Sequence, residues 1–491
     1  MRDLLTDPLW RAEDLGHAVP GAEHAVSVCL PLWEHVIGYE ENDPAVVGRF
    51  ACGYPRFFLH PRVRELFAVA AENFARPGET ALVFPTAAAA SRAAEHVRKK
   101  SGAACRIEAF GHHALAALVL PESAREPAWK RWQHGGEIVG SRQAEAALSG
   151  AEGAGEAGVA ARETVRRHLA ELYGQPAGNV FLFASGMAAI SAVQRLLAPG
   201  SPAAQIEFPY VDTLKGLNEF GFGAREIMRS ATGGVDETRA LLAAGPVAGV
   251  FTELPSNPLL RTADLAALAR LLTGTGAPLV VDDTVATAVN ADALRHADAV
   301  TTSLTKLYSG VGDVMAGAAV VRASSPFAAE WLSALAAAES ESPLYGADAV
   351  VLAKNGADFF ERAGRVNAGA EALFDFLAGH PKVARLWYPK TETPDRYEAV
   401  RREGGGYGGL FSLLIADPSG ARRFYDALRV TKGPSFGTHF SLASPYTLLA
   451  HYRELDWAKG RGVEPHLIRV WTGLEPAGDL IERFGEALAA A

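Results

Sequence analysis

The chain of 491 residues is too long for one hydrophobic core, and its 49% apolar and 21% charged residues are typical of a globular protein with two or three domains. A formal net charge of −9 without any Lys/Arg block argues against nucleic acid as a partner, and no apolar run reaches the ~18 residues of a membrane span. The acidic N-terminus lacks the apolar core of a secretory signal, and the three cysteines (Cys29, Cys52 and Cys105) include no close pair for a metal or redox motif, so we expect a cytoplasmic protein without a metal site.

The first 134 residues predict a small α/β layer ahead of the main part of the chain. Residues 62–76 have the pattern of a helix, 81–85 of a buried strand, 88–100 of a second helix and 105–109 of a second strand. Helices and strands in this order pack as layers around one small core. We therefore expect residues 1–134 to form an N-terminal α/β extension.

A glycine-rich segment at residues 153–158 (GAGEAG) matches the dinucleotide-binding fingerprint in its spacing. That fingerprint must follow a strand and open a helix. Residues 142–148, in front of the segment, have a helical pattern instead. We interpret the segment as part of a flexible connector, and the sequence contains no Walker phosphate loop.

From residue 162 onwards, helices alternate with short buried strands. Amphipathic residues 164–173 come first, and strands are expected at 179–183, 205–208, 247–251, 278–281 and 299–301. This alternation predicts an α/β fold with a mostly parallel central sheet, whose ligand site lies at the carboxyl ends of the strands. We assign residues 135–357 to this large domain and 358–491 to a smaller C-terminal α/β domain that ends in a strand–helix unit at 467–490.

Lys306 stands at the centre of the functional prediction, in the segment 301–306 (TTSLTK). A lysine that forms a Schiff base with an aldehyde cofactor needs a carboxylate near the ring nitrogen of the cofactor and donors for its phosphate. Hydroxyl residues flank the lysine, and Asp282 and Asp283 follow the strand at 278–281. The two aspartates point to opposite faces of an extended strand, and the residues alone do not choose between them.

Four motifs in register resemble the pyridoxal-phosphate (PLP) enzymes of cysteine and methionine metabolism: ELPSNP at 253–258, VDDT at 281–284, SLTK at 303–306 and GDVM at 312–315. The N-terminal extension, with WQH at 132–134 and KGPS at 432–435, resembles the longer, fungal-type cystathionine γ-synthases. The resemblance implies a PLP-dependent transferase of fold type I (aspartate aminotransferase-like) that acts on small amino-acid substrates. It also implies a homotetramer built from two active-site dimers.

The resemblance assigns the contacts of the cofactor ring. Lys306 carries the cofactor, and Asp282 is the aspartate that pairs with the ring nitrogen. Asn257 contacts the phenolic oxygen, and Tyr210 stacks on the ring and assists proton transfer. A helix start with backbone donors and hydroxyls suits the phosphate. We expect the phosphate contacts to come from Ser185, Gly186, Met187, Ser303 and Thr305.

Two segments compete to supply the cation of the phosphate site, which relatives bring from a neighbouring subunit in a Tyr-x-Arg motif. Arg142 has the nearer spacing, but Gly140 stands where the tyrosine is expected. Tyr54 and Arg56 keep the residue types but lie far upstream. We favour Arg142 and keep Tyr54 and Arg56 as second candidates, with an ordinary surface ion pair as the alternative for each arginine.

Arg469 lies in an apolar strand, in the segment 468–473 (IRVWTG), where an unpaired cation is costly. A planar guanidinium that binds an amino-acid carboxylate at two points explains it, and the segment is similar to the Ile-Arg-x-Ser-x-Gly element of the family. By resemblance, Ser435 helps to hold the lysine and the carboxylate. Asp212 and Lys215 are candidates for contact with the distal end of the substrate, a solvated loop being the alternative.

One position departs from the family. Short members carry a glutamate where this chain has Phe440, which leaves the identity of the sulfur nucleophile open. His134, His439 and His451 are interpreted as structural histidines.

The resemblance implies γ-replacement on an activated homoserine, O-acyl or O-phospho, with cysteine as the nucleophile and cystathionine as the product. The alternatives are another S, N or C nucleophile, or a γ- or β-lyase that releases a 2-oxo acid and ammonia. A non-catalytic PLP-fold binding protein is the third reading, and the intact Lys306, Asp282 and Arg469 argue against it. The leaving group and the task of the extension do not follow from the sequence.

Overall fold

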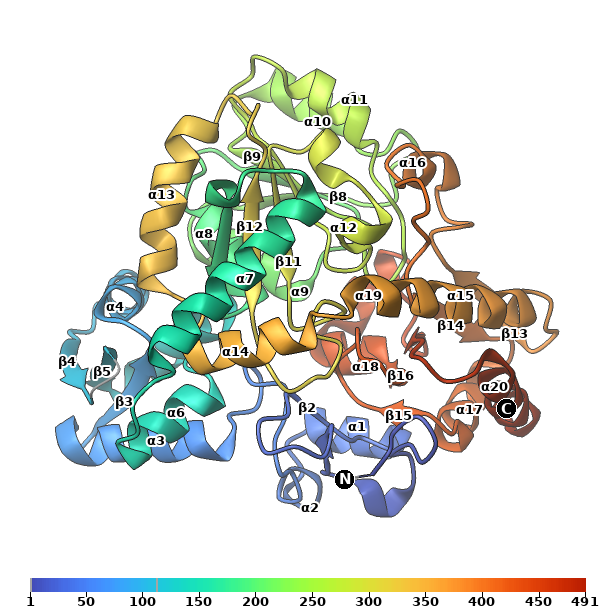
Figure 1. Cartoon of the computed structure of the whole chain (residues 1–491), viewed down its shortest axis with the longest axis horizontal. Coiled ribbons are helices and arrows are strands. Elements are labelled where there is room, and N and C mark those ends of the chain that lie inside the picture. Colours follow the sequence, from blue (N-terminus) through green and yellow to red (C-terminus); the bar gives the residue numbers. More distant parts are fainter. Residues whose placement is uncertain (1, 112–113) are drawn as a thin grey trace.

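The computed structural model describes residues 2–111 and 114–491. Its three larger sheets come from three successive parts of the chain (Figure 1). The N-terminal sheet lies at the lower left of the view, the central sheet lies above it, and the C-terminal sheet lies at the lower right. Within the described residues, no helix has both the length and the apolar composition needed to cross a bilayer.

The N-terminal part begins with a segment that has no layer of its own. Its elements are the paired strands β1 (Ala18–Val19) and β2 (Ser27–Val28), then α1 (Trp33–Glu40) and α2 (Pro44–Val47). A compact α/β unit follows, made of α3 (Pro61–Phe74), β3 (Glu79–Phe84), α4 (Ala87–Ser101), β4 (Arg106–Phe110), β5 (Leu115–Pro121), α5 (Arg125–Gly135) and α6 (Ser141–Ser149). The unpredicted strand β5 is the centre of its antiparallel sheet, in the order β3-β5-β4.

The central sheet has seven strands in the order β6-β12-β11-β10-β9-β7-β8, and β12 alone runs antiparallel to its neighbours. The predicted mostly parallel sheet is therefore confirmed. Its strands are β6 (Val180–Phe183), β7 (Ala203–Ile206), β8 (Ala224–Ile227), β9 (Gly249–Glu253), β10 (Leu279–Asp282), β11 (Ala299–Ser303) and β12 (Gly317–Val321). Its helices are α7 (Gly155–Tyr173), α8 (Gly186–Gln194), α9 (Val211–Glu219), α10 (Val235–Ala244), α11 (Leu265–Leu272), α12 (Thr287–Asn290), α13 (Ala328–Glu341) and α14 (Gly346–Asn355).

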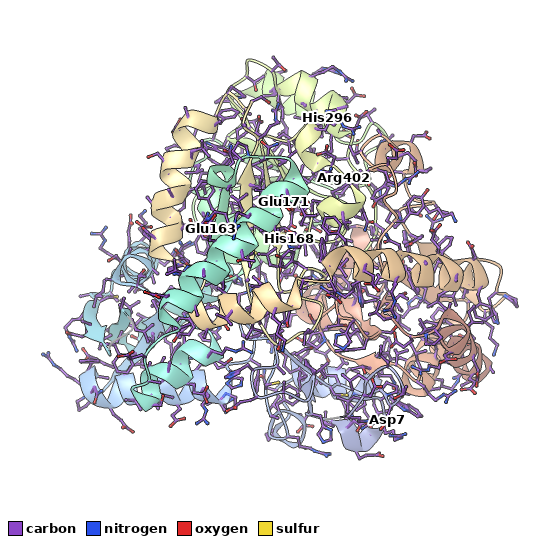
Figure 2. All side chains as sticks on the ribbon, viewed as in Figure 1. Asp7, Glu163, His168, Glu171, His296 and Arg402 are labelled. Carbon is purple, nitrogen blue, oxygen red and sulfur yellow. The ribbon has the colours of Figure 1, made fainter. Side chains whose placement is uncertain are left out.

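Helices cover both faces of this sheet because apolar residues fill both sides of each strand. On β10, Val281 packs into the cluster that contains the buried face of α7, whereas Val280 packs into the cluster that contains α8 and α13. On the outer side of α7, Glu163 and Glu171 face the viewer in Figure 2. The glycine-rich segment 153–158 follows α6 and runs into α7, so it lacks the preceding strand that a dinucleotide site requires.

The C-terminal part is a five-stranded sheet in the order β13-β14-β17-β16-β15, packed against helices α15, α17 and α20. Its strands are β13 (Val383–Trp387), β14 (Leu410–Ile415), β15 (Thr431–Lys432), β16 (Leu442–Pro445) and β17 (Ile468–Trp471). Its helices are α15 (Phe359–Ala378), α16 (Pro394–Glu398), α17 (Ala421–Ala427), α18 (Tyr446–His451), α19 (Leu455–Gly460) and α20 (Ala477–Ala490).

A buried carboxyl joins α7 to the end of β10. The Tyr173 hydroxyl donates to both carboxyl oxygens of Asp283, at 3.0 and 2.9 Å, and Asp283 is fully buried. Burial raises the pKa of Asp283 to about 7. An aspartate in an unfolded chain has a pKa of ~3.9, so the folded state retains a proton that the unfolded chain releases.

We predict that this proton makes the protein more stable in mild acid. The stabilisation is complete below about pH 4 and is lost as the pH rises towards about 7, at about 1.4 kcal/mol per pH unit. Asp283→Asn keeps an acceptor for Tyr173 but does not ionise, so its free energy of unfolding is expected to fall less than that of the wild type between pH 5 and pH 7. Urea unfolding at both pH values measures this, with Asp236→Asn on the exposed side of α10 as the control. Parallel pH profiles for wild type and Asp283→Asn would contradict the prediction.

Candidate active site

The carboxyl ends of β9, β10 and β11 open into a cavity of about 780 Å³. Glu253, Asp282 and Ser303, the last residues of these strands, all line it. Other walls come from the N-terminal segment, from α5, and from the C-terminal sheet with α18. The cavity therefore lies where a mostly parallel sheet is expected to bind its ligand, and all three parts of the chain enclose it.

Lys306 follows β11 and is buried in the wall of this cavity, with 7% of its surface exposed. Its Nζ donates to the Ser435 hydroxyl at 2.9 Å and lies 4.6 Å from the ring centre of Tyr54 and 4.8 Å from that of Phe436. Burial, together with the charge of Arg469, lowers the pKa of the Lys306 amine. A lysine with a lowered pKa is a better nucleophile and base at neutral pH than a solvated one.

The two aspartates after β10 have different environments. Asp282 lines the cavity, where its carboxylate accepts from the backbone N–H of Thr284 at 2.9 Å. Asp283 faces away and bonds to Tyr173. Burial raises the pKa of Asp282, and burial beside Asp282 raises that of the neighbouring Glu253. No cation within the described residues lies within 4.0 Å of either of these two cavity carboxyls, so a cationic ring nitrogen would compensate them.

Helix α8 points its N-terminus at the cavity, and Ser185, Gly186 and Met187 line the wall there. The Ser185 hydroxyl caps this helix by accepting from the N–H of Ala188 at 3.1 Å. A Cβ on Gly186 would approach the Cβ of Ser303 to 2.9 Å, so only glycine allows the helix start to lie so close to the end of β11. Ser303 and Thr305 also line the wall at this corner. Backbone donors at a helix start, with hydroxyls beside them, form an anion site.

These groups fit pyridoxal phosphate, the cofactor that the sequence predicts. The buried Asn257 Oδ1 in the cavity wall has no hydrogen-bond partner among the described residues, as expected of an atom that bonds to a ligand. Asp282 is a half-buried carboxyl with no cation within 4.0 Å among the described residues, the helix start is an anion site, and Lys306 is a buried amine. The Tyr210 side chain adds an aromatic face to the same cavity. The predicted contacts of the cofactor ring and of the helix start at the phosphate thus all line this cavity, and their individual roles stay predictions.

Arg56 is a fully buried guanidinium at the base of the cavity. It donates to the Tyr210 hydroxyl, to the Asp212 carboxylate, and to the carbonyl of Gln133 at 2.8 Å. Burial opposes ionisation of the neighbouring Tyr54, but the charges of Lys306 and Arg56 outweigh it and lower the pKa of the Tyr54 hydroxyl. Tyr54 and Arg56, the second candidates for the phosphate cation, therefore lie in the cavity of their own chain.

Arg142 and Asp212 do not line the cavity. Arg142, on α6, donates to the Asp348 carboxylate at 2.9 Å and to the Asp313 carbonyl at 2.8 Å, so in its own chain it forms an ion pair. Its predicted contact with the phosphate of a neighbouring chain stays a prediction. Asp212 is fully buried behind Arg56, where Arg56 and His134 overcome its burial and lower its pKa to about 2. This position does not support its predicted direct contact with substrate.

Arg469, on β17, faces the cavity between the rings of Phe436 and Tyr446, whose centres lie 5.2 and 5.1 Å from the guanidinium carbon. It donates to the carbonyl of Pro434 at 2.9 Å. Burial lowers the pKa of its guanidinium, and no carboxylate among the described residues lies within 4.0 Å of it. A buried cation without a counterion suits the carboxylate of an amino acid. Ser435 and Lys215, the other predicted substrate contacts, lie next to Lys306 and in the cavity wall respectively.

Several residues of the wall carry no signal in the sequence that would predict their place in the site. Tyr446, Leu449, Ala450 and Arg453 come from one side of α18 and its continuation, and Trp129 comes from α5. Their spacing is that of ordinary helix faces, which core packing also produces. Of the histidines, His134 reaches the wall while bonded to Asp212 at 2.9 Å. Phe440 is fully buried outside the wall.

Two family models and several known proteins match most of the chain. Residues 156–489 match the model of the Cys/Met metabolism PLP-dependent enzymes, and residues 62–140 match the N-terminal domain of fungal trans-sulfuration enzymes. The chain is 32% identical to cystathionine γ-synthase of Neurospora crassa, over 97% of this chain and 98% of that protein. It is 36% identical to the L-2-amino-4-chloropent-4-enoate dechlorinase/desaturase of Streptantibioticus cattleyicolor, over 96% of this chain and 97% of that protein.

Among solved structures, the cystathionine γ-synthase of Xanthomonas oryzae in complex with cystathionine superimposes with a TM-score of 0.59 at 26% identity, over 66% of this chain and 83% of that one. The cavity with Lys306, Asp282 and Arg469 is formed mainly by the segment that the family model covers. The chain therefore belongs to the Cys/Met metabolism PLP-dependent enzymes, with the fold of PLP fold type I and an N-terminal domain of the fungal trans-sulfuration type.

Proposed function

We propose that the protein catalyses γ-replacement on an O-acyl or O-phospho homoserine, with cysteine as the nucleophile and cystathionine as the product. The main support for the proposal is that the buried Lys306 amine and the Arg469 guanidinium line the same cavity. Among the described residues, Arg469 has no carboxylate within 4.0 Å. Arg469 is available for an α-carboxylate, and Lys306 for the protons beside it. The cystathionine γ-synthases among the relatives support the choice of reaction.

When bound, pyridoxal phosphate withdraws electrons from the α-carbon of an amino acid and makes its neighbouring protons acidic. Arg469 holds the α-carboxylate at two points and so fixes that carbon. The Lys306 Nζ, held by the Ser435 hydroxyl at 2.9 Å, takes and returns the protons of the α- and β-carbons, and its lowered pKa keeps the neutral amine accessible. In the net reaction the Cγ–O bond breaks, sulfur takes its place and the thiol proton is released, so no oxidant or reductant is needed.

Tyr54 and Tyr210 have opposite tasks in this proposal. Burial raises the pKa of the Tyr210 hydroxyl well above its ordinary value, so Tyr210 stays protonated and serves as an aromatic wall, which does not support its predicted part in proton transfer. The lowered pKa of Tyr54, next to Lys306, makes its phenolate accessible, and the phenolate accepts a proton from the ammonium form of the lysine. The proposed phosphate contacts are the helix start at Gly186 and the hydroxyls of Ser303 and Thr305. We also propose a cytoplasmic homotetramer, as the resemblance implies.

A second candidate is an elimination, in which the leaving group departs, no second amino acid adds, and a 2-oxo acid and ammonia are released. The relative named dechlorinase/desaturase, at 36% identity, supports this candidate.

Product mass separates the two candidates. The PLP-loaded protein is incubated with O-acetyl-, O-succinyl- and O-phosphohomoserine, each with and without cysteine. We expect cystathionine from one of these substrates when cysteine is present, and the productive substrate identifies the leaving group. Release of 2-oxobutyrate that cysteine does not divert would replace the proposed γ-replacement with the elimination. An absence of any product would contradict both candidates.

Loss of the Arg469 charge is expected to weaken substrate binding. Hydrogen bonds to charged groups are worth about 1.5–3 kcal/mol, so Arg469→Met is expected to raise the KM for the homoserine substrate roughly 10- to 100-fold. Steady-state kinetics measure this, and the cofactor absorbance of the variant shows that it is folded and loaded. Arg239→Met, which removes an exposed arginine on α10, is the control. An unchanged KM in Arg469→Met would show that the carboxylate binds elsewhere.

A further inference from the structure

Three charged side chains that line the cavity have no bonding partner among the residues that the structure describes. Glu40 ends α1, Lys215 lies on α9, and Arg453 lies on the short 3-10 helix η6 (Tyr452–Glu454). Within the part of the chain that the structure describes, none of the three side chains makes a hydrogen bond, or an ion pair within 4.0 Å. The adjacent Glu41 differs, because it accepts a hydrogen bond from Tyr452 at 2.5 Å and does not line the cavity.

Two helical segments connect the site around Lys306 and Arg469 to the two cations, Lys215 and Arg453. On α18 and η6, the residues that line the cavity are Tyr446, Leu449, Ala450 and Arg453, spaced i, i+3, i+4 and i+7 on one helix face. Tyr446 packs against Arg469, and seven residues of helix advance by about 10 Å. On α9, Val211 and Lys215 share one face and follow Tyr210. Arg453 and Lys215 therefore lie outward from the site of the first amino acid.

Glu40 belongs to the same charged group. Burial raises the pKa of its carboxyl to about 7, although the charges of Arg453 and Lys215 act in the opposite direction. Glu454 also faces Lys215, but its carboxylate is bonded to His451 at 2.8 Å. Tyr39 and Tyr452 complete the surroundings of Glu40. The group thus offers two unpaired cations and one unpaired carboxyl.

We propose that Glu40, Lys215 and Arg453 form the binding site for the second substrate, an α-amino acid that bears the nucleophile. Its carboxylate binds between Lys215 and Arg453, and its ammonium binds Glu40. Two occupants are possible for this site, the zwitterionic second substrate and the anionic leaving group of the first. The carboxyl of Glu40 favours the zwitterion, because it would repel a phosphate or succinate group. The inference rests on the proposed γ-replacement and assigns to the N-terminal segment a role in choosing the nucleophile.

The test compares three thiols in the holoenzyme with the homoserine substrate at saturation: cysteine, 3-mercaptopropionate, which lacks the ammonium, and cysteamine, which lacks the carboxylate. Variants are Glu40→Gln and the double variant Lys215→Gln/Arg453→Gln. Controls are Glu41→Gln and Arg461→Gln, whose side chains bind Tyr452 and Glu226. We expect the KM for cysteine to rise roughly tenfold or more in each test variant, from loss of hydrogen bonds to charged groups. In Glu40→Gln, the rate without a thiol and the KM for the homoserine substrate are expected to stay within twofold.

The pattern across thiols gives the sharper result. Glu40→Gln is expected to lose most of its preference for cysteine over 3-mercaptopropionate and to keep its preference for cysteine over cysteamine. The double variant is expected to keep the first preference and to lose most of the second. Cystathionine formation with an unchanged KM for cysteine in both test variants overturns this inference alone. A raised KM for the homoserine substrate in the double variant also overturns it, because the cations then hold the leaving group. A wild type without turnover on any activated homoserine overturns the proposed function and this inference together.

Discussion

The ion pair between Arg56 and Asp212 is the contact on which the rest of the site depends. Both side chains are fully buried, and the guanidinium also binds Tyr210 and the carbonyl of Gln133. It therefore ties together the N-terminal segment, α5 and α9, the helix that follows β7 of the seven-stranded sheet. Removing one member of such a pair leaves an uncompensated buried charge, at a cost of about 3–5 kcal/mol, so the pair fixes the N-terminal segment over the strand ends.

Four charged or titratable groups around the cofactor site are only partly compensated by the rest of the chain. Deep in the wall, Asp282 and Glu253 are carboxyls with raised pKa, and Lys306 and Arg469 are cations with lowered pKa. Each of these groups is desolvated and incompletely compensated by the chain, which is costly for a folded protein unless a ligand supplies the missing charge. Pyridoxal phosphate and an amino acid carry complementary charges, so the binding of both is expected to stabilise the folded protein.

The sequence predicted the sheet and the inner site because short, strongly apolar strands end in polar residues at fixed motifs. Asp282 ends β10 and Lys306 follows β11, and these two strands are parallel neighbours in the sheet. Other features had no local signal. Strand β5 is buried along almost its whole length, so it lacks the alternation of a half-exposed strand, and Arg453 reaches the cavity only through the packing of α18. The position of Tyr54 beside Lys306 depends on a contact across 252 residues, which no spacing rule predicts.

The packing of α1 against α18 constrains the order in which the molecule assembles. Val36 of α1 and Leu448 of α18 belong to one small apolar cluster, although roughly 400 residues separate them. A ribosome that adds about 5–20 residues per second needs roughly 20–80 s to synthesise the chain between them. The unit from α3 to α6 is built from local contacts and is free to fold in that interval, whereas the apolar face of α1 stays exposed. Closure of the cavity is therefore among the last steps of folding, and a nascent chain acquires its cofactor pocket only after nearly all of it has left the ribosome.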